Sequence, residues 1–276
     1  MFKVMALAVL AGSALLAGAA QAAPSVERGS YLVNTIAGCG NCHTPQGPDG
    51  PIADKALSGM LVEQNDAYTA IAPNITPAGD IRNWTDAQVI KAIREGIQPD
   101  GKLLGPPMPF EVYKGMSDTD VASIVMYLRT VPAVENDPGE SHYNIPLPPA
   151  YGPPIEHVAD VPEGVTVEYG AYLAGPLGHC IVCHSTFGPQ GPMLDTALGA
   201  GGQPFPGPWG TSVAANITPT GIGHYSDEDL TKIITTGTRP DGSHLLPPMP
   251  IWAYANLKPD DVKAIILYLR SLPPKG

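Results

Sequence analysis

The feature that most constrains this chain is an internal repeat that covers most of its length. Sliding the sequence along itself until Cys39 meets Cys180 aligns the run CGNCH at 39–43 with CIVCH at 180–184, and PPMP at 106–109 with PPMP at 247–250. The sequence NITP also occurs twice, at 74–77 and 216–219, one position out of register. A repeat of about 110 residues is too long for a solenoid unit and is the size of a small domain. The pattern therefore predicts two tandem domains.

The N-terminal segment, 1–22, has the plan of a secretory signal peptide. A positive charge at Lys3 precedes an apolar run, and the small-residue pattern AQA ends at Ala22. The apolar run, 4–20, is close to the lower length limit for crossing a bilayer, so an uncleaved anchor is the alternative. We expect cleavage near Ala22 and a periplasmic protein whose mature chain has no transmembrane anchor.

Three segments follow the predicted signal peptide. Residues 23–132 and 166–276 are the two predicted domains, and residues 133–165 form a Pro-rich, acidic linker. After residue 22 the chain has 14 basic and 26 acidic residues, a formal charge of −12, which argues against nucleic acid as a partner. The linker holds six acidic residues and no Lys or Arg, and it is either a solvated spacer or a docking surface.

Each repeat contains three helical segments and little that alternates like a strand. The first leads into the cysteine run, and the second begins at an N-cap, Thr85 or Ser226, and ends near Gly96 or Gly237. The third, 120–130 and 260–271, has apolar residues at helical spacing. The expected fold class is therefore all-α and loop-rich. Three helices cannot enclose so much loop alone, so another group must fill the core.

All four cysteines lie in the two CxxCH runs. A redox CxxC normally opens a helix in a βαβ unit, which is not visible here, and an imidazole beside the second thiolate is awkward for tetrahedral zinc. Positions i, i+3 and i+4 share one face of a helical turn, so two thiols can attach one porphyrin while the histidine ligates its iron. We therefore expect two covalently bound haem c groups. The attachment residues are Cys39, Cys42, Cys180 and Cys183, and the proximal iron ligands are His43 and His184.

A second axial ligand is expected from a loop on the opposite side of each haem. Met108 and Met249 stand at the same separation from the CxxCH histidine of their repeat, and both are enclosed by prolines. A lone methionine in such a place would be a core plug. These two repeat in register, so the sequence predicts that they ligate iron. His244 is the rival ligand in the second repeat, where Leu103 stands at the matching place in the first.

Each repeat resembles a class I cytochrome c domain in its order of N-terminal helix, CxxCH, long loop, methionine loop and C-terminal helix. NITP, the run GIGHYSDEDL at 221–230 and Met-Pro before the last helix resemble, more narrowly, cytochrome c subunits of periplasmic alcohol, aldehyde, gluconate and nicotinate-type dehydrogenases. The resemblance implies two tandem class I domains, each wrapped around one covalent haem c. Many such subunits carry three haems and a C-terminal membrane anchor, whereas this chain has two CxxCH runs.

Ligation by His and Met fills both axial positions of a haem, which disfavours oxygen chemistry and raises the potential. We therefore expect a periplasmic dihaem cytochrome c without catalytic residues. It would relay electrons from a dehydrogenase donor to the respiratory chain, through another cytochrome or a quinone-linked or oxidase acceptor. The alternative is a dihaem peroxidase-type oxidoreductase, which needs one haem with an open distal side. The matching PPMP loops argue against that asymmetry. A non-haem metal or dithiol protein is the second alternative.

Overall fold

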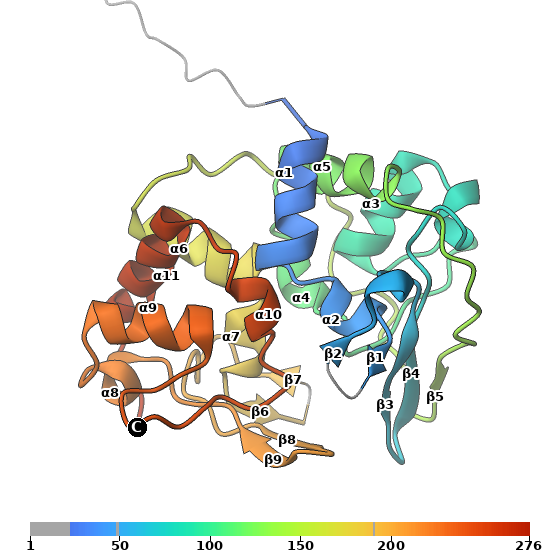
Figure 1. Ribbon diagram of the computed structural model, residues 1–276. Helices are drawn as coiled ribbons and strands as arrows, with labels where there is room; N and C mark the ends of the chain where they lie inside the picture. The colour runs from blue at the N-terminus through green and yellow to red at the C-terminus, as the bar shows by residue number, and fades with distance from the viewer. Residues whose placement is uncertain (1–22, 48–49, 190) are drawn as a thin grey trace, which may run out of the picture.

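The computed structural model describes residues 23–47, 50–189 and 191–276. The predicted signal peptide, residues 1–22, lies outside the described residues. We call residues 23–132 the first half, residues 166–276 the second half and residues 133–165 the connecting segment. Figure 1 shows the two halves as lobes side by side, the first in blue to green and the second in yellow to red.

Short helices make up most of the regular structure, and apart from η2 they follow the same order in each half. The helices of the first half are α1 (Val26–Tyr31), η1 (Leu32–Ile36), α2 (Gly40–His43), η2 (Ala53–Lys55), η3 (Asp80–Asn83), α3 (Asp86–Glu95), α4 (Phe110–Tyr113) and α5 (Asp118–Leu128). Those of the second half are α6 (Val167–Tyr172), η4 (Leu173–Leu177), α7 (Cys180–Cys183), α8 (Pro219–Ile222), α9 (Asp227–Thr236), α10 (Ile251–Tyr254) and α11 (Pro259–Ser271). The elements η1 and η4 are π-helical turns that continue α1 and α6.

The predicted ends of the middle helices are confirmed. Thr85 and Ser226 each accept a hydrogen bond from the backbone of the third helical residue, which returns a side-chain bond to the cap. Gly96 and Gly237 end α3 and α9 with φ of 68°. This left-handed conformation suits glycine because it has no Cβ.

The expectation of an all-α fold is wrong, because the described chain contains several β-sheets as well as helices. Strands β3 (Met60–Gln64), β4 (Tyr68–Ala72) and β5 (His142–Tyr143) form one antiparallel sheet. Two-stranded ladders join β1 (Gln46–Gly47) to β2 (Gly50–Pro51), β6 (Phe187–Gly188) to β7 (Gly191–Pro192), and β8 (Pro204–Gly207) to β9 (Gly210–Val213). Long loops must pair their backbone groups, and hairpins do so locally. These strands are too short to give a clear two-residue periodicity.

In each half the first helix crosses the last one at a glycine. A Cβ on Gly29 of α1 would lie 1.9 Å from the carbonyl oxygen of Ser123 in α5. A Cβ on Gly170 of α6 would lie 1.9 Å from the carbonyl oxygen of Ala264 in α11. Only glycine allows this approach. One continuous apolar core then runs through both halves, and it includes the apolar faces of α5 and α11.

The connecting segment lies along the first half. Its strand β5 pairs with β4, and the phenol of Tyr143 donates to the carbonyl of Pro106 at 2.8 Å. The phenol of Tyr151 donates to the carbonyl of Leu104 at 2.8 Å, and its ring stacks on Phe110 at 4.9 Å between centroids. Part of this acidic segment is therefore packed rather than a freely solvated spacer. Among the described residues, no helix is both long and apolar enough to cross a membrane.

Candidate functional site

Each CxxCH run forms one helical turn that brings two thiols and an imidazole together. The amide of His43 donates to the carbonyl of Cys39 at 2.9 Å, and the amide of His184 donates to the carbonyl of Cys180 at 3.0 Å. All four cysteines are free thiols and half-buried. Burial raises the pKa of Cys42 and of Cys180 to about 11. A redox CxxC has a lowered thiol pKa instead, so these thiols lack its signature.

Both histidines are fixed by a backbone carbonyl. Nδ1 of His43 lies 2.8 Å from the carbonyl oxygen of Pro73, and Nδ1 of His184 lies 2.8 Å from that of Ala215. A carbonyl only accepts hydrogen bonds, so Nδ1 carries the proton and Nε2 keeps its lone pair for a metal. Burial lowers the pKa of both imidazoles, which favours this neutral form. The two halves therefore present the same donor atom, Nε2, in the same way.

The NITP sequence builds the turn that carries this carbonyl. Asn74 follows Pro73 directly, and its Oδ1 accepts from the amide and the hydroxyl of Thr76 at 2.9 and 2.7 Å. Its Nδ2 donates to the carbonyl of Val134 at 2.8 Å, at the start of the connecting segment. The sequence analysis used NITP as evidence of the repeat and of the family resemblance, and it did not predict this role. Its recurrence after each CxxCH run was the available signal.

The second half repeats the turn with one contact changed. Oδ1 of Asn216 accepts from the amide and hydroxyl of Thr218 at 2.9 and 2.7 Å, as Asn74 does with its threonine. Nδ2 of Asn216 donates to the carbonyl of Lys275 at 2.8 Å, close to the C-terminal end of the sequence. Each turn is therefore tied to the segment that follows the last helix of its half.

The predicted methionine ligands lie on separate loops that pack on the same core. Met108 and Met249 are half-buried and contact the apolar cluster. Each precedes a short helix whose first amide donates to the methionine carbonyl, at 3.0 Å for Phe110 and 2.9 Å for Ile251. The rival His244 is exposed, and its Nδ1 lies 3.3 Å from the hydroxyl of Thr238. Burial on the core thus favours the methionine over His244.

The donor atoms of each CxxCH run suit a haem better than a bare metal ion. In the part of the chain that the structure describes, no three His, Cys, Asp or Glu side chains are grouped to hold a metal ion. The donor set of each run is two protonated thiols, a neutral imidazole and, on a separate loop, a thioether. That set fits a haem attached through two thioether bonds and ligated by nitrogen and sulfur.

Comparison with known proteins agrees with this chemistry. The family model of cytochrome c matches residues 26–132. A diheme cytochrome c-type protein of Cereibacter sphaeroides is 30% identical over 253 residues, which cover 86% of this chain and 82% of the relative. The chain belongs to the cytochrome c family. Membership implies covalently bound haem c, which the donor atoms of the CxxCH turns fit.

Other relatives of this cytochrome are subunits of dehydrogenases. The cytochrome subunit of fructose dehydrogenase from Gluconobacter japonicus is 32% identical over 92% of this chain and 54% of the relative. The cytochrome c subunit of the quinone alcohol dehydrogenase from Gluconacetobacter polyoxogenes is 28% identical over 99% of this chain and 61% of the relative. The chain therefore spans between half and two thirds of the length of these relatives.

Proposed function

We propose that this cytochrome is a periplasmic dihaem protein that relays electrons from a dehydrogenase to the respiratory chain. The two halves are two tandem cytochrome c domains, and each holds one haem c. The first haem is attached by Cys39 and Cys42 and ligated by His43 and Met108. The second haem is attached by Cys180 and Cys183 and ligated by His184 and Met249.

One observation carries this proposal: both halves present the same half-buried imidazole, fixed through Nδ1 by a carbonyl at 2.8 Å. When bound, each haem supplies a reversible one-electron couple. The protein fixes the imidazole orientation through the carbonyl and raises its basicity, which tunes the iron. The methionine loops occupy equivalent positions in the two halves. This equivalence favours two closed carrier sites over a peroxidase, which needs one open site.

The donor is proposed from the names of the relatives. Cytochrome subunits of fructose and alcohol dehydrogenases align with nearly the whole chain, so the donor is proposed to be a dehydrogenase of this kind. The formal charge of −12 after residue 22 favours docking to a basic acceptor. Such docking weakens as salt screens the charges. Export rests on the signal-like residues 1–22.

A reduced-minus-oxidised visible spectrum with a haem-to-protein ratio tests the proposal. We expect the bands of a low-spin c-type haem, two haems per chain, and little binding of carbon monoxide by the reduced protein. One haem per chain would contradict the dihaem assignment. Stoichiometric carbon monoxide binding at one haem, or fast peroxide turnover, would favour the peroxidase instead.

A further inference from the structure

Two tyrosine–aspartate hydrogen bonds join the halves of this cytochrome reciprocally. The phenol of Tyr172, from the second half, donates to Oδ2 of Asp120 in the first half at 2.8 Å. The phenol of Tyr31, from the first half, donates to Oδ2 of Asp261 in the second half at 2.5 Å. The two tyrosines align with each other in the repeat, and so do the two aspartates. Each half therefore donates one such hydrogen bond to the other half and accepts one from it, as in a two-fold symmetric interface. We call these bonds the two clamps.

The backbone completes each clamp in the same way. The amide of Ser117 donates to the phenol oxygen of Tyr172 at 3.0 Å, and the amide of Lys258 donates to that of Tyr31 at 3.1 Å. Both amides lie at the N-cap of the last helix of their half. Each phenol thus both donates and accepts, and its hydrogen-bonding capacity is used across the interface.

Three of the four clamp side chains are buried and Tyr31 is half-buried, so opening the clamps would be costly. The aspartates Asp120 and Asp261 are 5% and 4% exposed, and Tyr172 is 5% exposed. Burial raises the pKa of both Tyr31 and Tyr172 well above the ordinary range, so the phenols keep their protons. Buried polar groups that lose a partner cost about 1–3 kcal/mol each, so the clamps favour one arrangement of the halves over others.

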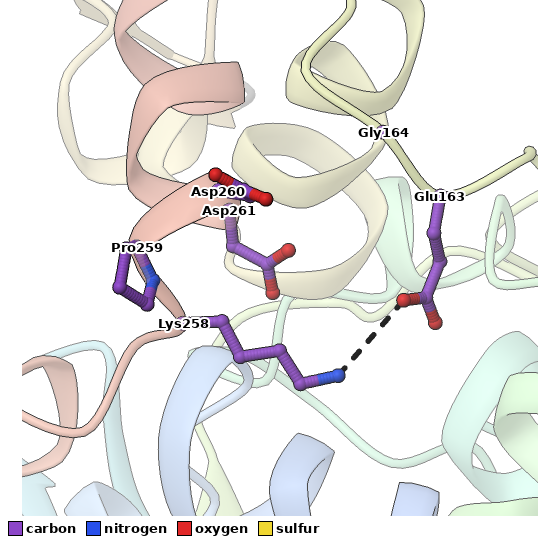
Figure 2. A pocket seen from close by; sticks show the side chains of 6 residues that line it. All are labelled: Glu163, Gly164, Lys258, Pro259, Asp260 and Asp261. Carbon is purple, nitrogen blue, oxygen red and sulfur yellow. Dashed lines mark ion pairs between the residues drawn. The ribbon is translucent and has the colours of Figure 1, made fainter.

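Around the clamp formed by Tyr31 and Asp261, charged side chains line the interface where it meets solvent. A pocket there is lined by Glu163, Gly164, Lys258, Pro259, Asp260 and Asp261, and Figure 2 shows Lys258 reaching toward Glu163. The ammonium of Lys258 lies 3.9 Å from that carboxylate and 4.7 Å from the centre of the Tyr31 ring. Glu163 also lies 3.0 Å from Arg28, which holds Asp120 with two hydrogen bonds. The end of the connecting segment therefore links both clamps.

Deeper in the interface, the two halves pack too closely for one to slide past the other. A Cβ on Gly178 would lie 2.9 Å from Cδ1 of Ile36, and a Cβ on Gly115 would lie 2.9 Å from Cγ of Pro176. Nε2 of His179 lies 3.3 Å from the carbonyl oxygen of Ala37. Close-packed surfaces of this kind hold discrete positions rather than a continuous range.

The CxxCH turns lie close to this contact. Asn41, inside the first CxxCH run, donates through Nδ2 to the carbonyl of Pro248 at 3.2 Å, and Pro248 immediately precedes Met249. The ring of Tyr113 in the first half meets the ring of His179 edge-on at 5.8 Å between centroids, and His179 immediately precedes Cys180. Side chains of both halves therefore meet next to the CxxCH turns.

We propose that the two clamps are positioning elements that hold the two haem sites at one separation, so that an electron passes between them within the chain. In this step one iron loses an electron and the other gains it, with no net proton change. The inference rests on the proposed dihaem function. Tyr31 and Tyr172 act on the transfer only through the placement of the halves.

The test compares the double variant Tyr31→Phe/Tyr172→Phe with the control Tyr127→Phe in the haem-loaded protein. Tyr127 accepts a hydrogen bond from Asn34 at 2.8 Å within the first half, so the control loses the same hydroxyl without touching the interface. Differential scanning calorimetry reports whether the halves unfold together. Pulse radiolysis with less than one electron per chain reports the rate of exchange between the haems.

We expect the wild type and the control to unfold in one transition and to exchange electrons at a rate independent of protein concentration. The double variant should unfold in two transitions. Its exchange should be about tenfold slower, because small displacements of reacting groups cost rate steeply. If the double variant fails to fold, Tyr31→Phe alone, at a half-buried site, should show the same changes in weaker form.

A double variant with one transition and wild-type exchange would overturn the clamp inference. Wild-type protein that carries two haems but exchanges no electrons within the chain would also overturn it. Wild-type protein with fewer than two haems would instead overturn the proposed function. Haem content and unfolding are measured separately, so the two failures can be told apart.

Discussion

Replacing Asn74 by Ala tests the turn that holds the first histidine. Asn74 is 5% exposed and makes four side-chain hydrogen bonds: Nδ2 donates to the carbonyls of Val134 and Asn136, and Oδ1 accepts from the amide and hydroxyl of Thr76. The alanine variant removes all four bonds, two of which satisfy the amide and hydroxyl of the buried Thr76. It also loosens the neighbouring carbonyl of Pro73, which binds His43.

The expected size of the effect follows from the count of bonds. A net hydrogen bond is worth about 1 kcal/mol, so the four bonds of Asn74 give a loss of about 4 kcal/mol in the free energy of unfolding. Asn216→Ala in the second half removes three bonds and should cost about 3 kcal/mol. Asn65→Ala is the control, because Asn65 also makes three hydrogen bonds but is exposed. It should cost about 1 kcal/mol or less.

Guanidinium unfolding of the haem-loaded variants and a redox titration provide the measurements. A less firmly held imidazole is less basic, so the potential of one haem should rise in Asn74→Ala while the other stays constant. Asn216→Ala should raise the other potential instead. An Asn74→Ala variant that is as stable as Asn65→Ala and leaves both potentials unchanged would contradict the role assigned to this turn.

Three further predictions concern single side chains. Burial raises the pKa of Asp261, so the folded state favours the protonated carboxyl. This contribution to stability is present below about pH 4 and is lost as the pH rises through the raised pKa. The Asp261→Asn variant should not lose stability in this way. Urea unfolding at pH 4 and pH 7 checks whether the free energy of unfolding of the variant, relative to that of the wild type, increases with pH. Tyr151→Ala removes the stack on Phe110 and should lower the free energy of unfolding by about 3 kcal/mol. It should also expose the connecting segment, so a timed protease digest should cut the variant faster than the wild type. Met108→Ala and Met249→Ala should each admit about one equivalent of carbon monoxide, because each opens one axial position, and equal binding by the wild type would contradict this.

The sequence predicted best those features that depend on neighbouring residues. Thr85 and Ser226 cap their helices as expected, because a cap needs only the three residues that follow it. The CxxCH turns form as expected, because the spacing of two thiols and an imidazole is local. The strands β3 and β4 were missed, because short strands with mixed side chains give little periodicity.

Features that depend on backbone groups, or on contacts between residues far apart in the chain, were harder to predict from the sequence. The carbonyl of Pro73 that fixes His43 has no side-chain signature, although the adjacent NITP sequence repeats. The clamp between Tyr31 and Asp261 joins residues 230 positions apart. Both residues recur in register, but a repeat does not say whether a residue pairs within its own half or with the other.

The central claim is that each CxxCH run binds one haem covalently. Mass spectrometry of the purified protein under denaturing conditions tests it most directly, followed by digestion to locate the modified peptides. We predict a mass greater than that of the chain by two haem groups, with one haem on the peptide containing Cys39 and Cys42 and one on that containing Cys180 and Cys183. A mass equal to the bare chain, or haem that acid acetone extracts, would contradict the account.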